Sequence, residues 1–413
     1  MPSVNLPDTS GFHHVFVTFL DLEGVMRGKI LPFRSIMAPG SVVRFSLSEL
    51  YFHRPQKMEE LVLFPDLETI MPIPLWPGWA WVTGDLWVAG EPFIECARTL
   101  ARRCLAHEAI EQGGKVLAAV ECEFALVEEA ESLAVQMGRP DLRYRKTSYS
   151  ISRTLHFGKF VRMITEGLTE CGFEDVVVHF EAGATQIEVN WGPASPLVTA
   201  DRHCFVKFYT RLVANELNIR VDYAPMAARD WTFNAAHVHF SRSGERGERT
   251  YSSKEVSRNL LLSSPYVAGL VNPVETSYKR INQSSLRNMN RHVVSDIERG
   301  GAVRITDRGT IEFRQPDAAA NPYLVQVATM YGAFVMKHDL GDNHHSATGD
   351  DAGMSVAFPT SLRQSLSIMG ACPQLTEFLG RPFLDAYSAF KRQRAIEYDC
   401  RPTDLDAFNC KVL

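Results

Sequence analysis

The chain has 413 residues, of which 45% are hydrophobic and 22% are charged, a composition typical of a globular protein with room for two domains. Its formal net charge of −5 argues against nucleic acid or an anionic membrane surface as a partner. The N-terminus has no charged segment followed by an apolar one, so no signal peptide is expected. The longest apolar run, 323–336, is too short to cross a membrane and is predicted to be a buried helix.

The eight cysteines are scattered along the chain, at positions 96, 104, 122, 171, 204, 372, 400 and 410. No two of them form a CxxC pair, so their spacing indicates neither a zinc site nor a disulfide framework. Reduced thiols in a cytoplasmic protein are the simplest interpretation.

The first part of the chain is predicted to be rich in strands. HHVFVTFLD and VMRGKILPF alternate apolar and polar residues around a turn at LEGV, the pattern of a β-hairpin. A stretch rich in Pro, Gly and Trp follows at 74–93. We place a domain boundary near residue 95, which divides the chain into an N-terminal domain at 1–95 and a larger domain at 96–413.

The larger part mixes long helices with short strands. VVVHFEAG and RVDYAP are predicted strands. This order of elements is α+β and differs from the βα alternation that builds a parallel sheet. Apolar periodicity and terminal glycines predict helices at 94–114, 152–172, 202–219, 361–380 and 381–399.

The segment VECEFALV (120–127) places two glutamates in an otherwise apolar strand. Side chains alternate faces along a strand, so Glu121 and Glu123 point to the same side, with Cβ atoms ~6–7 Å apart. Taken alone, such a pair is usually a solvated strand face.

Two further segments repeat this pattern. AAHVHFS (235–241) places His237 and His239 on one strand face. TIEFRQPD (310–317) does the same for Glu312 and Arg314, which alone would indicate a surface pair. In both segments the intervening residue is Val or Phe, which suits an apolar opposite face.

A fourth segment, HFEAGATQIEVNW (179–191), contains Glu181 and Glu188. Their odd spacing puts them on opposite faces of a regular strand. Gly183 lies between them, and a bulge or a loop there would re-aim one of the two carboxylates.

If these four segments share one sheet, one face is apolar and the other carries five carboxylates, two imidazoles and an arginine. Converging carboxylates repel one another and have raised pKa values unless a cation lies among them. Oxygen ligands with an occasional imidazole suit Mg²⁺ or Mn²⁺. The glutamates are therefore predicted to be metal ligands, although spacing alone does not name an enzyme.

The order of these motifs resembles that of the glutamine synthetase family. ECEF, HFEAGATQIEVN and AAHVHFS are followed by NPVETSYKR (272–280) and RITDRGTIEFRQPDAAANPYL (304–324), and the combination is specific. The resemblance covers nearly the whole chain. It implies an α+β fold with a small N-terminal β-grasp domain and a large catalytic domain, in which helices back a curved antiparallel sheet.

The resemblance also implies a role for each acidic residue, in a site that holds two or three Mg²⁺ or Mn²⁺ ions. Glu312 is also implied in catalysis, and Glu123 in substrate binding. By position, the implied metal ligands are Glu123, Glu181 and Glu188 for one ion and Glu121, His237 and Glu312 for a second.

Four arginines match family residues that bind anions. Arg299 and Arg304, in ERGGAVRI, match those that hold the ATP phosphates, and Arg299 matches the one that stabilises phosphoryl transfer. Arg280 and Arg314 match the arginines that clamp the carboxylate substrate. His239 falls near the nucleotide.

The activity implied is that of an ATP-dependent carbon–nitrogen ligase. The family transfers the γ-phosphoryl group of ATP to a carboxylate, and an amine then attacks the acyl phosphate. Metal ions and arginines offset the repulsion between the two anions. The resemblance further implies a homo-oligomeric ring, a dodecamer or a decamer, with active sites between subunits.

Two departures from the family pattern concern the amine. VRFSLSELYF (43–52) has no Asp where the family contacts ammonium, although Glu49 is nearby. The flap INQSSLRNMNRH (281–292) has no acid where the family has a glutamate. Ammonium ions need negative groups to hold and deprotonate them at pH 7. These losses favour a glutamate–amine ligase whose amine is not ammonia, with a weakly basic or aromatic amine as the candidate.

A third departure concerns the acid. Thr232 and Phe233 stand where the family has an Asn-Gly pair that contacts the amino end of glutamate. The close backbone approach that glycine permits is lost at Phe233, which leaves open a ligase for a different carboxylic acid. An inert binding or regulatory relative and a kinase acting on another acceptor also stay open.

Replacement of Leu286 in the flap by glutamate should raise ammonia-dependent activity, because it restores a negative group that can hold and deprotonate ammonium. The measurement is ATP-dependent amide formation with ammonia, in the Leu286→Glu variant and in the parent chain. Equal rates would show that the flap is not what excludes ammonia.

Overall fold

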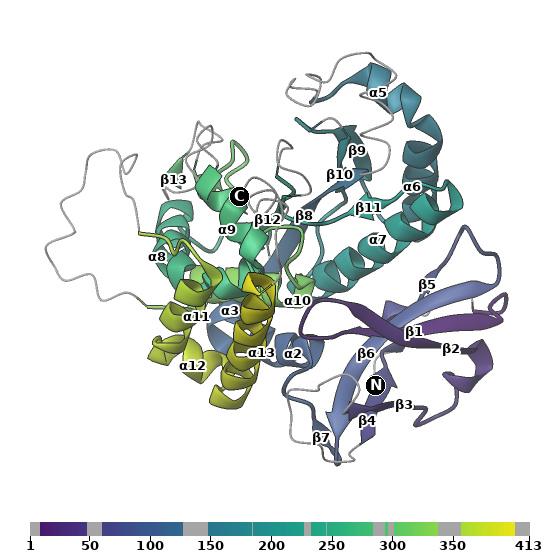
Figure 1. The fold of residues 1–413 in the computed structure, drawn as a ribbon, viewed down its shortest axis with the longest axis horizontal. Coiled ribbons are helices and arrows are strands. Elements are labelled where there is room, and N and C mark those ends of the chain that lie inside the picture. Colours follow the sequence, from purple (N-terminus) through teal and green to yellow (C-terminus); the bar gives the residue numbers. More distant parts are fainter. Residues whose placement is uncertain are drawn as a thin grey trace, which may run out of the picture.

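The computed structural model describes residues 9–47, 60–126, 148–183, 185–226, 233–244, 246–283, 294–295, 301–337 and 357–400. Within these ranges the chain forms two β-sheets, and helices pack between and around them (Figure 1). The mixture of helices with mainly antiparallel strands confirms the predicted α+β class.

The first sheet has seven strands in the order β2-β1-β6-β4-β3, with β5 and β7 also paired to β6. The predicted hairpin around LEGV is confirmed as β1 and β2. Asp21 closes its turn by accepting hydrogen bonds from the N–H groups of Glu23 and Val25. The strands are β1 (His14–Leu20), β2 (Met26–Pro32), β3 (Val43–Ser46), β4 (Glu60–Pro65), β5 (Met71–Pro72), β6 (Trp79–Val88) and β7 (Glu91–Pro92), with short helices η1 (Phe33–Ser35) and η2 (Leu67–Thr69).

The second sheet has eight strands in the order β13-β14-β15-β12-β8-β10-β9, with β11 also paired to β8. All neighbours are antiparallel except β13 and β14. The strands are β8 (Lys115–Leu126), β9 (Val177–Phe180), β10 (Gln186–Asn190), β11 (Val221–Asp222), β12 (Ala236–Ser243), β13 (Val294–Ser295), β14 (Val303–Ile305) and β15 (Ile311–Phe313).

Helices α7 (Pro196–Glu216), α8 (Ser253–Val271) and α10 (Pro322–Met330) pack together, and α7 and α8 contact the second sheet. Three predicted helices are broken, because 94–114 divides at His107, 152–172 divides at Phe157, and 361–380 divides at Ala371 and Cys372. The remaining helices are α2 (Ala97–Leu105), α3 (Glu108–Glu111), α5 (Ile151–His156), α6 (Gly158–Glu170), α9 (Glu275–Gln283), η4 (Tyr331–Val335), α11 (Leu362–Gly370), α12 (Pro373–Leu379) and α13 (Arg381–Asp399).

The central strand β8 shows why the second sheet has one apolar and one polar face. Its even-numbered side chains from Val116 to Phe124 are buried in the hydrophobic core. The odd-numbered side chains point the opposite way, and Glu121 and Glu123 are among them. The local alternation in the sequence therefore decides which face of the sheet is acidic.

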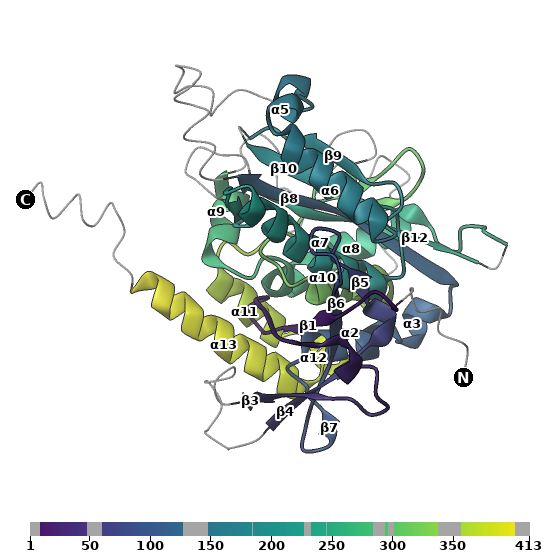
Figure 2. The same cartoon turned by 90° about the vertical axis from the view of Figure 1, so that its right-hand side faces the viewer.

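Helix α2 contacts strand β6 of the first sheet as well as helices α7 and α10 (Figures 1 and 2), and its Arg98 links the first sheet to α7. Its guanidinium donates two hydrogen bonds to Asp201 on α7, at 2.8 and 3.0 Å, and one to Asp66 after β4, at 2.7 Å. It also lies 3.1 Å from the carboxylate of Asp85 on β6. Tyr323 on α10 donates to the same Asp201. One buried cation thus joins the first sheet to helix α7, which packs against β8 of the second sheet.

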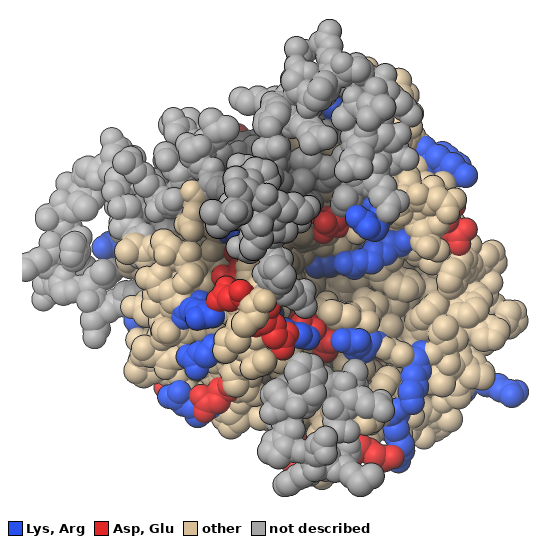
Figure 3. All heavy atoms as spheres, in the orientation of Figure 1, with Lys and Arg blue, Asp and Glu red and all other residues tan. Residues whose placement is uncertain are grey.

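None of the helices in the described ranges is long and apolar enough to cross a membrane. Lysine and arginine side chains are interspersed with acidic ones over the described part of the face in Figure 3. The predicted boundary near residue 95 falls between β7 of the first sheet and α2, and its position stays a prediction.

Replacement of Arg98 by methionine should destabilise the fold by about 3–5 kcal/mol, because three carboxylates then lose a cation that is itself 3% exposed. The measurement is urea denaturation of the Arg98→Met variant and the parent chain. Arg102 contacts Asp66 and Asp85 but is half exposed, so Arg102→Met should cost no more than about 1 kcal/mol. Equal losses in the two variants would contradict this role of Arg98.

Candidate metal site

Strand register brings the predicted polar residues together on one face of the second sheet. His237 on β12 lies opposite Glu121 on β8, and His239 lies opposite Glu312 on β15. On the other side of β8, Glu188 on β10 lies opposite Glu123. Residues directly opposite in an antiparallel pair project to the same face, so these side chains are neighbours.

The hairpin of β9 and β10 explains how Glu181 joins this face. His179 lies opposite Glu188, and Glu181 follows two residues later, so all three side chains share one face. The N–H of Glu181 donates to the carbonyl of Gln186 at 2.9 Å, which continues the pairing into the turn. The loop at Gly183 therefore re-aims the carboxylate, and no bulge within a single strand is needed.

One cluster forms around Glu121, His239 and Glu312, whose ligand atoms all lie within 4.8 Å of one another. Glu121 contacts Nδ1 of His237 at 2.7 Å and Nε2 of His239 at 2.9 Å. Burial acts to raise the pKa of Glu121, but hydrogen bonds with these two imidazoles hold that pKa well below its usual value. Glu121 is thus an anion at neutral pH.

Two arginines contact Glu312, which belongs to this first cluster. Arg314 forms a short ion pair with one carboxylate oxygen, and Nε of Arg304 lies 2.5 Å from the other. Burial acts to raise the pKa of Glu312, but the pKa is lowered by His237 and Arg314. Cations already balance this carboxylate, so it can face further negative charge.

The second cluster contains His179, Glu181 and Glu188, again with ligand atoms within 4.8 Å of one another. Nε2 of His179 lies 3.2 Å from Glu188, and Nδ1 lies 3.7 Å from Glu181. Burial acts to lower the pKa of His179, and the carboxylate of Glu188 raises it above its usual value. A cation is therefore favoured at this point between the two glutamates.

Glu123 lies beside the second cluster. Its Oε2 accepts hydrogen bonds from Nε2 of Gln186 at 2.7 Å and from the N–H of Ala235 at 2.8 Å. Burial and then the charge of Glu188 raise the pKa of Glu123 to about 8. Carboxylates that destabilise one another in this way fit a divalent cation, because oxygen ligands and negative charge are what Mg²⁺ and Mn²⁺ need.

A cavity of about 220 Å³ lies over these residues. It contains eight of the eleven predicted site residues, and His239 contacts Glu121 in the same cluster. The lining residues are Glu121, Glu123, Tyr149, His179, Glu181, Glu188, Asn190, His237, Arg304, Glu312 and Arg314.

Arg280 is not among the lining residues. It is 2% exposed and donates to the backbone carbonyls of Gln315 and Arg314. It therefore supports the segment directly after β15, which carries Arg314. The carbonyl of Phe233 accepts a hydrogen bond from Gln186, which also holds Glu123. The predicted residues that lie outside the described ranges are Glu49, Thr232, Arg299 and the flap beyond 283.

Three lining residues were not predicted from the sequence. His179 shares a strand face with Glu181, so alternation within HFE was a usable signal for it. Asn190 donates to Glu188 at 2.8 Å from two residues further along the same strand. Tyr149 lies with its ring centroid 5.0 Å from that of His179, and it has a φ of 63°. No local pattern marks this tyrosine.

Comparison with known proteins matches residues 94–409 to the family model described as the catalytic domain of glutamine synthetase. The glutamine synthetase of Rhizobium meliloti (strain 1021) is 26% identical over 408 residues, 92% of each chain. The gamma-glutamylpolyamine synthetase of Streptomyces coelicolor is 25% identical and covers 92% of this chain and 89% of its own. The solved structure described as "Apo GmaS without ligand" superposes with a TM-score of 0.81 at 25% identity, covering 96% of both chains.

The affinity of the site for Mn²⁺ should rise from pH 6 to pH 9, because Glu123 with a pKa of about 8 must lose its proton to act as a ligand. Titration calorimetry in buffers of different ionisation enthalpy would measure both the affinity and the proton released. Glu123→Gln should remove the released proton. Glu121→Gln is the matched control, since Glu121 is already ionised, and it should weaken binding while proton release persists. Unchanged proton release in Glu123→Gln would contradict the prediction.

Proposed function

The chain belongs to the glutamine synthetase family and is an ATP-dependent carbon–nitrogen ligase, and we propose that it joins the γ-carboxyl group of glutamate to an amine other than ammonia. The observation that supports ligase chemistry is the single sheet face on which five carboxylates meet three imidazoles and two arginines. A relative at nearly the same identity as one named glutamine synthetase is named for polyamines, so relatives at this distance include ligases for amines other than ammonia.

We assign the carboxylates of the acidic face to metal binding, and we assign the neighbouring imidazoles and N–H donors to orienting those carboxylates. Bound Mg²⁺ or Mn²⁺, two or three ions per site, would neutralise the phosphates of ATP and the charge that develops on the transferred phosphoryl group. Glu121 is held by two imidazoles and Glu123 by two N–H donors, so both carboxylates are oriented before any ligand arrives. The assigned ligands are Glu123, Glu181 and Glu188 for one ion and Glu121, His237 and Glu312 for the other.

The described geometry adds one alternative to this assignment. In this alternative His179 is a metal ligand together with Glu181 and Glu188, and His239 is a ligand together with Glu121 and Glu312, because the ligand atoms of each set lie within 4.8 Å of one another. In the assignment, His239 lies near the nucleotide and His179 orients Glu188.

The arginines are assigned to the two anionic substrates. Arg304 and Arg299 would hold the ATP phosphates, and Arg299 would stabilise the transferring group together with Glu312. Arg314 would hold the substrate carboxylate, with Glu123 at the other end of the substrate. Arg280, predicted to share this task, would act behind the cavity by positioning Arg314 through the carbonyls of Gln315 and Arg314. Guanidinium groups suit both tasks, because their planar donors match carboxylate and phosphate oxygens.

The reaction proceeds in two steps. A carboxylate oxygen of the acid attacks the γ-phosphorus of ATP, ADP leaves, and an acyl phosphate forms. The amine nitrogen then attacks the acyl carbon, phosphate leaves, and the nitrogen loses a proton to give the amide. Exclusion of water from the 220 Å³ cavity would protect the acyl phosphate from hydrolysis.

The chemistry of the amine follows from the acids that the sequence lacks. Ammonia and alkylamines are mostly protonated at pH 7, so a site for them needs a negative group near the attacking nitrogen. The flap has none, and its Arg287 and Arg291 add positive charge. A weakly basic or aromatic amine is already neutral and needs no such group.

A different carboxylic acid is the second candidate, and Phe233 favours it. This residue stands where the family has a glycine near the amino end of glutamate, and its side chain is partly exposed. An inert relative is the weaker alternative, because the predicted metal ligands and three of the four arginines lie in the described structure on or behind one face. We further propose the division into domains at residue 95 and a ring of ten or twelve subunits with active sites between them.

The first test is phosphate release from ATP with Mg²⁺ or Mn²⁺ and glutamate, across ammonia, hydroxylamine, alkylamines, diamines and aromatic amines. Release that depends on glutamate and on one amine class, with amide formed and little activity from ammonia, is the expected result. Phosphate transferred to the acceptor and not freed would instead indicate a kinase. No release with any amine would overturn glutamate as the acid.

Glu312→Ala is the control for this assay. The variant should lose phosphate release by at least about a hundredfold, because it removes a carboxylate at the centre of one cluster. Circular dichroism would check that the variant folds. Near-normal ATP turnover in the folded variant would contradict the metal assignment.

A further inference from the structure

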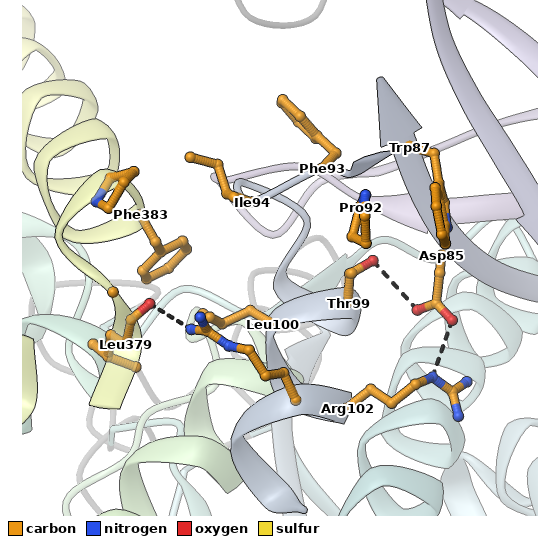
Figure 4. Close-up of a pocket in the computed structure, with 13 residues that line it drawn as sticks. Asp85, Trp87, Pro92, Phe93, Ile94, Thr99, Leu100, Arg102, Leu379 and Phe383 are labelled. Atoms are coloured by element: carbon orange, nitrogen blue, oxygen red, sulfur yellow. Dashed lines mark hydrogen bonds and ion pairs between the residues drawn. The ribbon is translucent and has the colours of Figure 1, made fainter. Parts of the chain in front are cut away.

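Two cavities outside the metal site differ in what their linings offer to a ligand. The apolar pocket in Figure 4, about 510 Å³, lies between β6, α2 and α13. Its described charged groups are already paired, since Asp85 accepts from Thr99 and Arg102, and Arg103 donates to the carbonyl of Leu379. This lining therefore has no charge left with which to select a ligand.

The second cavity, about 420 Å³, lies where the β1–β2 turn, the start of α9 and the end of α13 meet. Three of its charged residues form a closed set, because Arg394 pairs with Glu23 at 2.7 Å and with Glu397 at 2.6 Å. The cavity shares no residue with the metal site. Its apolar wall consists of Pro273, Val274, Leu362 and Ala395.

Lys391 also lines this cavity and is 4% exposed. Within the described ranges its ammonium group makes no hydrogen bond, and it lies 5.6 Å from the centroid of the Tyr387 ring. Burial lowers the pKa of Lys391 to about 8, while Glu23, Asp21 and Asp317 raise it from a distance. An ammonium group that borders a cavity and has no acceptor in the described chain can donate hydrogen bonds to an anion held there.

Glu275, the first residue of α9, lines the same cavity and is partly exposed. Among the described residues it has no ion-pair partner within 4 Å, and the N–H of Leu362 donates to it. Burial and then the charge of Asp399 raise its pKa. The lining thus presents the cation Lys391 and the anion Glu275 beside an apolar wall. Neither has an ion-pair partner within 4 Å in the described ranges.

We propose that this cavity binds a small α-amino acid. The carboxylate of such a ligand would accept a hydrogen bond from Lys391, its ammonium group would lie beside Glu275, and a short apolar side chain would contact the wall. A zwitterion satisfies both charges, whereas a simple carboxylate or a simple amine satisfies one and leaves the other unpaired. The site is separate from the proposed ligase reaction.

The location of the cavity gives the ligand a structural consequence. Glu23 belongs to the β1–β2 turn, Glu275 opens the helix that carries Arg280, and Lys391 belongs to α13. A ligand that contacts all three elements binds the folded chain and not the unfolded one, so it raises the midpoint of thermal unfolding.

Titration calorimetry of the full chain with L-alanine, without ATP or metal, tests the proposal. Propionate and ethylamine serve as the two halves of the probe, each with one of its charges. We expect L-alanine to bind at least about tenfold more tightly than either half, and Lys391→Met to weaken its binding at least about tenfold. No binding of L-alanine, or equal binding of propionate, would overturn the proposal.

Three further variants test whether L-alanine binds in this cavity or elsewhere on the chain. Glu275→Gln should remove the preference for L-alanine over propionate, and this partly exposed position decides the matter if Lys391→Met fails to fold. Lys254→Met changes an exposed lysine on α8 and should leave binding unchanged.

Glu188→Gln should also leave the binding of L-alanine unchanged, whereas loss of binding in this variant would place L-alanine in the metal site. If Lys391 only balances Asp21, Glu23 and Asp317, Lys391→Met will lower the thermal midpoint and leave L-alanine binding as it was, which would overturn the proposal.

Discussion

Five carboxylates on one face of a β-sheet repel one another, and the arrangement of the surrounding residues offsets part of this repulsion. Glu121 is hydrogen-bonded to His237 and His239, and Glu312 is paired with Arg304 and Arg314. Glu123 is not balanced in this way, and its raised pKa records the remaining excess of negative charge. A site that is incomplete without added cations is what a reaction between two anions requires, since the same cations then serve the substrates.

The acidic face is tolerated because the other face of the sheet is thoroughly apolar. Every second residue of β8 lies in the core against α7 and its neighbours, so the strand is held firmly while its glutamates remain at the cavity. Hydrogen bonds from Gln186 and Ala235 then fix one oxygen of Glu123. The scaffold therefore orients the charged groups before any ligand binds, which is the condition for effective electrostatic stabilisation of a transition state.

The same physical problem, a buried charge that needs a partner, appears at two other places and is solved differently. Arg98 is surrounded by Asp66, Asp85 and Asp201, and this set joins the first sheet to helix α7. Lys391 has no such partner within the described structure, and a cavity lies beside it. Arg98 has three carboxylates within 3.1 Å, whereas Lys391 has no ion-pair partner within 4 Å in the described ranges, and this difference is the reason to regard the first as structural and the second as a place for a ligand.

The sequence alone was sufficient for the α+β class, the hairpin at LEGV and the shared faces of Glu121 with Glu123 and of His237 with His239. These features depend on the two-residue period of a strand and on turn residues, which are local properties. The departures at Thr232–Phe233 and in the flap were also readable in the sequence, because they are differences in residue type. The tertiary structure decided which side chains meet across strands: the pairing of His237 with Glu121, the approach of Glu181 to Glu188 around the β9–β10 turn, and the arrival of His179 and Tyr149 at the cavity. Register and burial arise from contacts between segments far apart in the chain, as the burial of Lys391 also shows, and no local period encodes them.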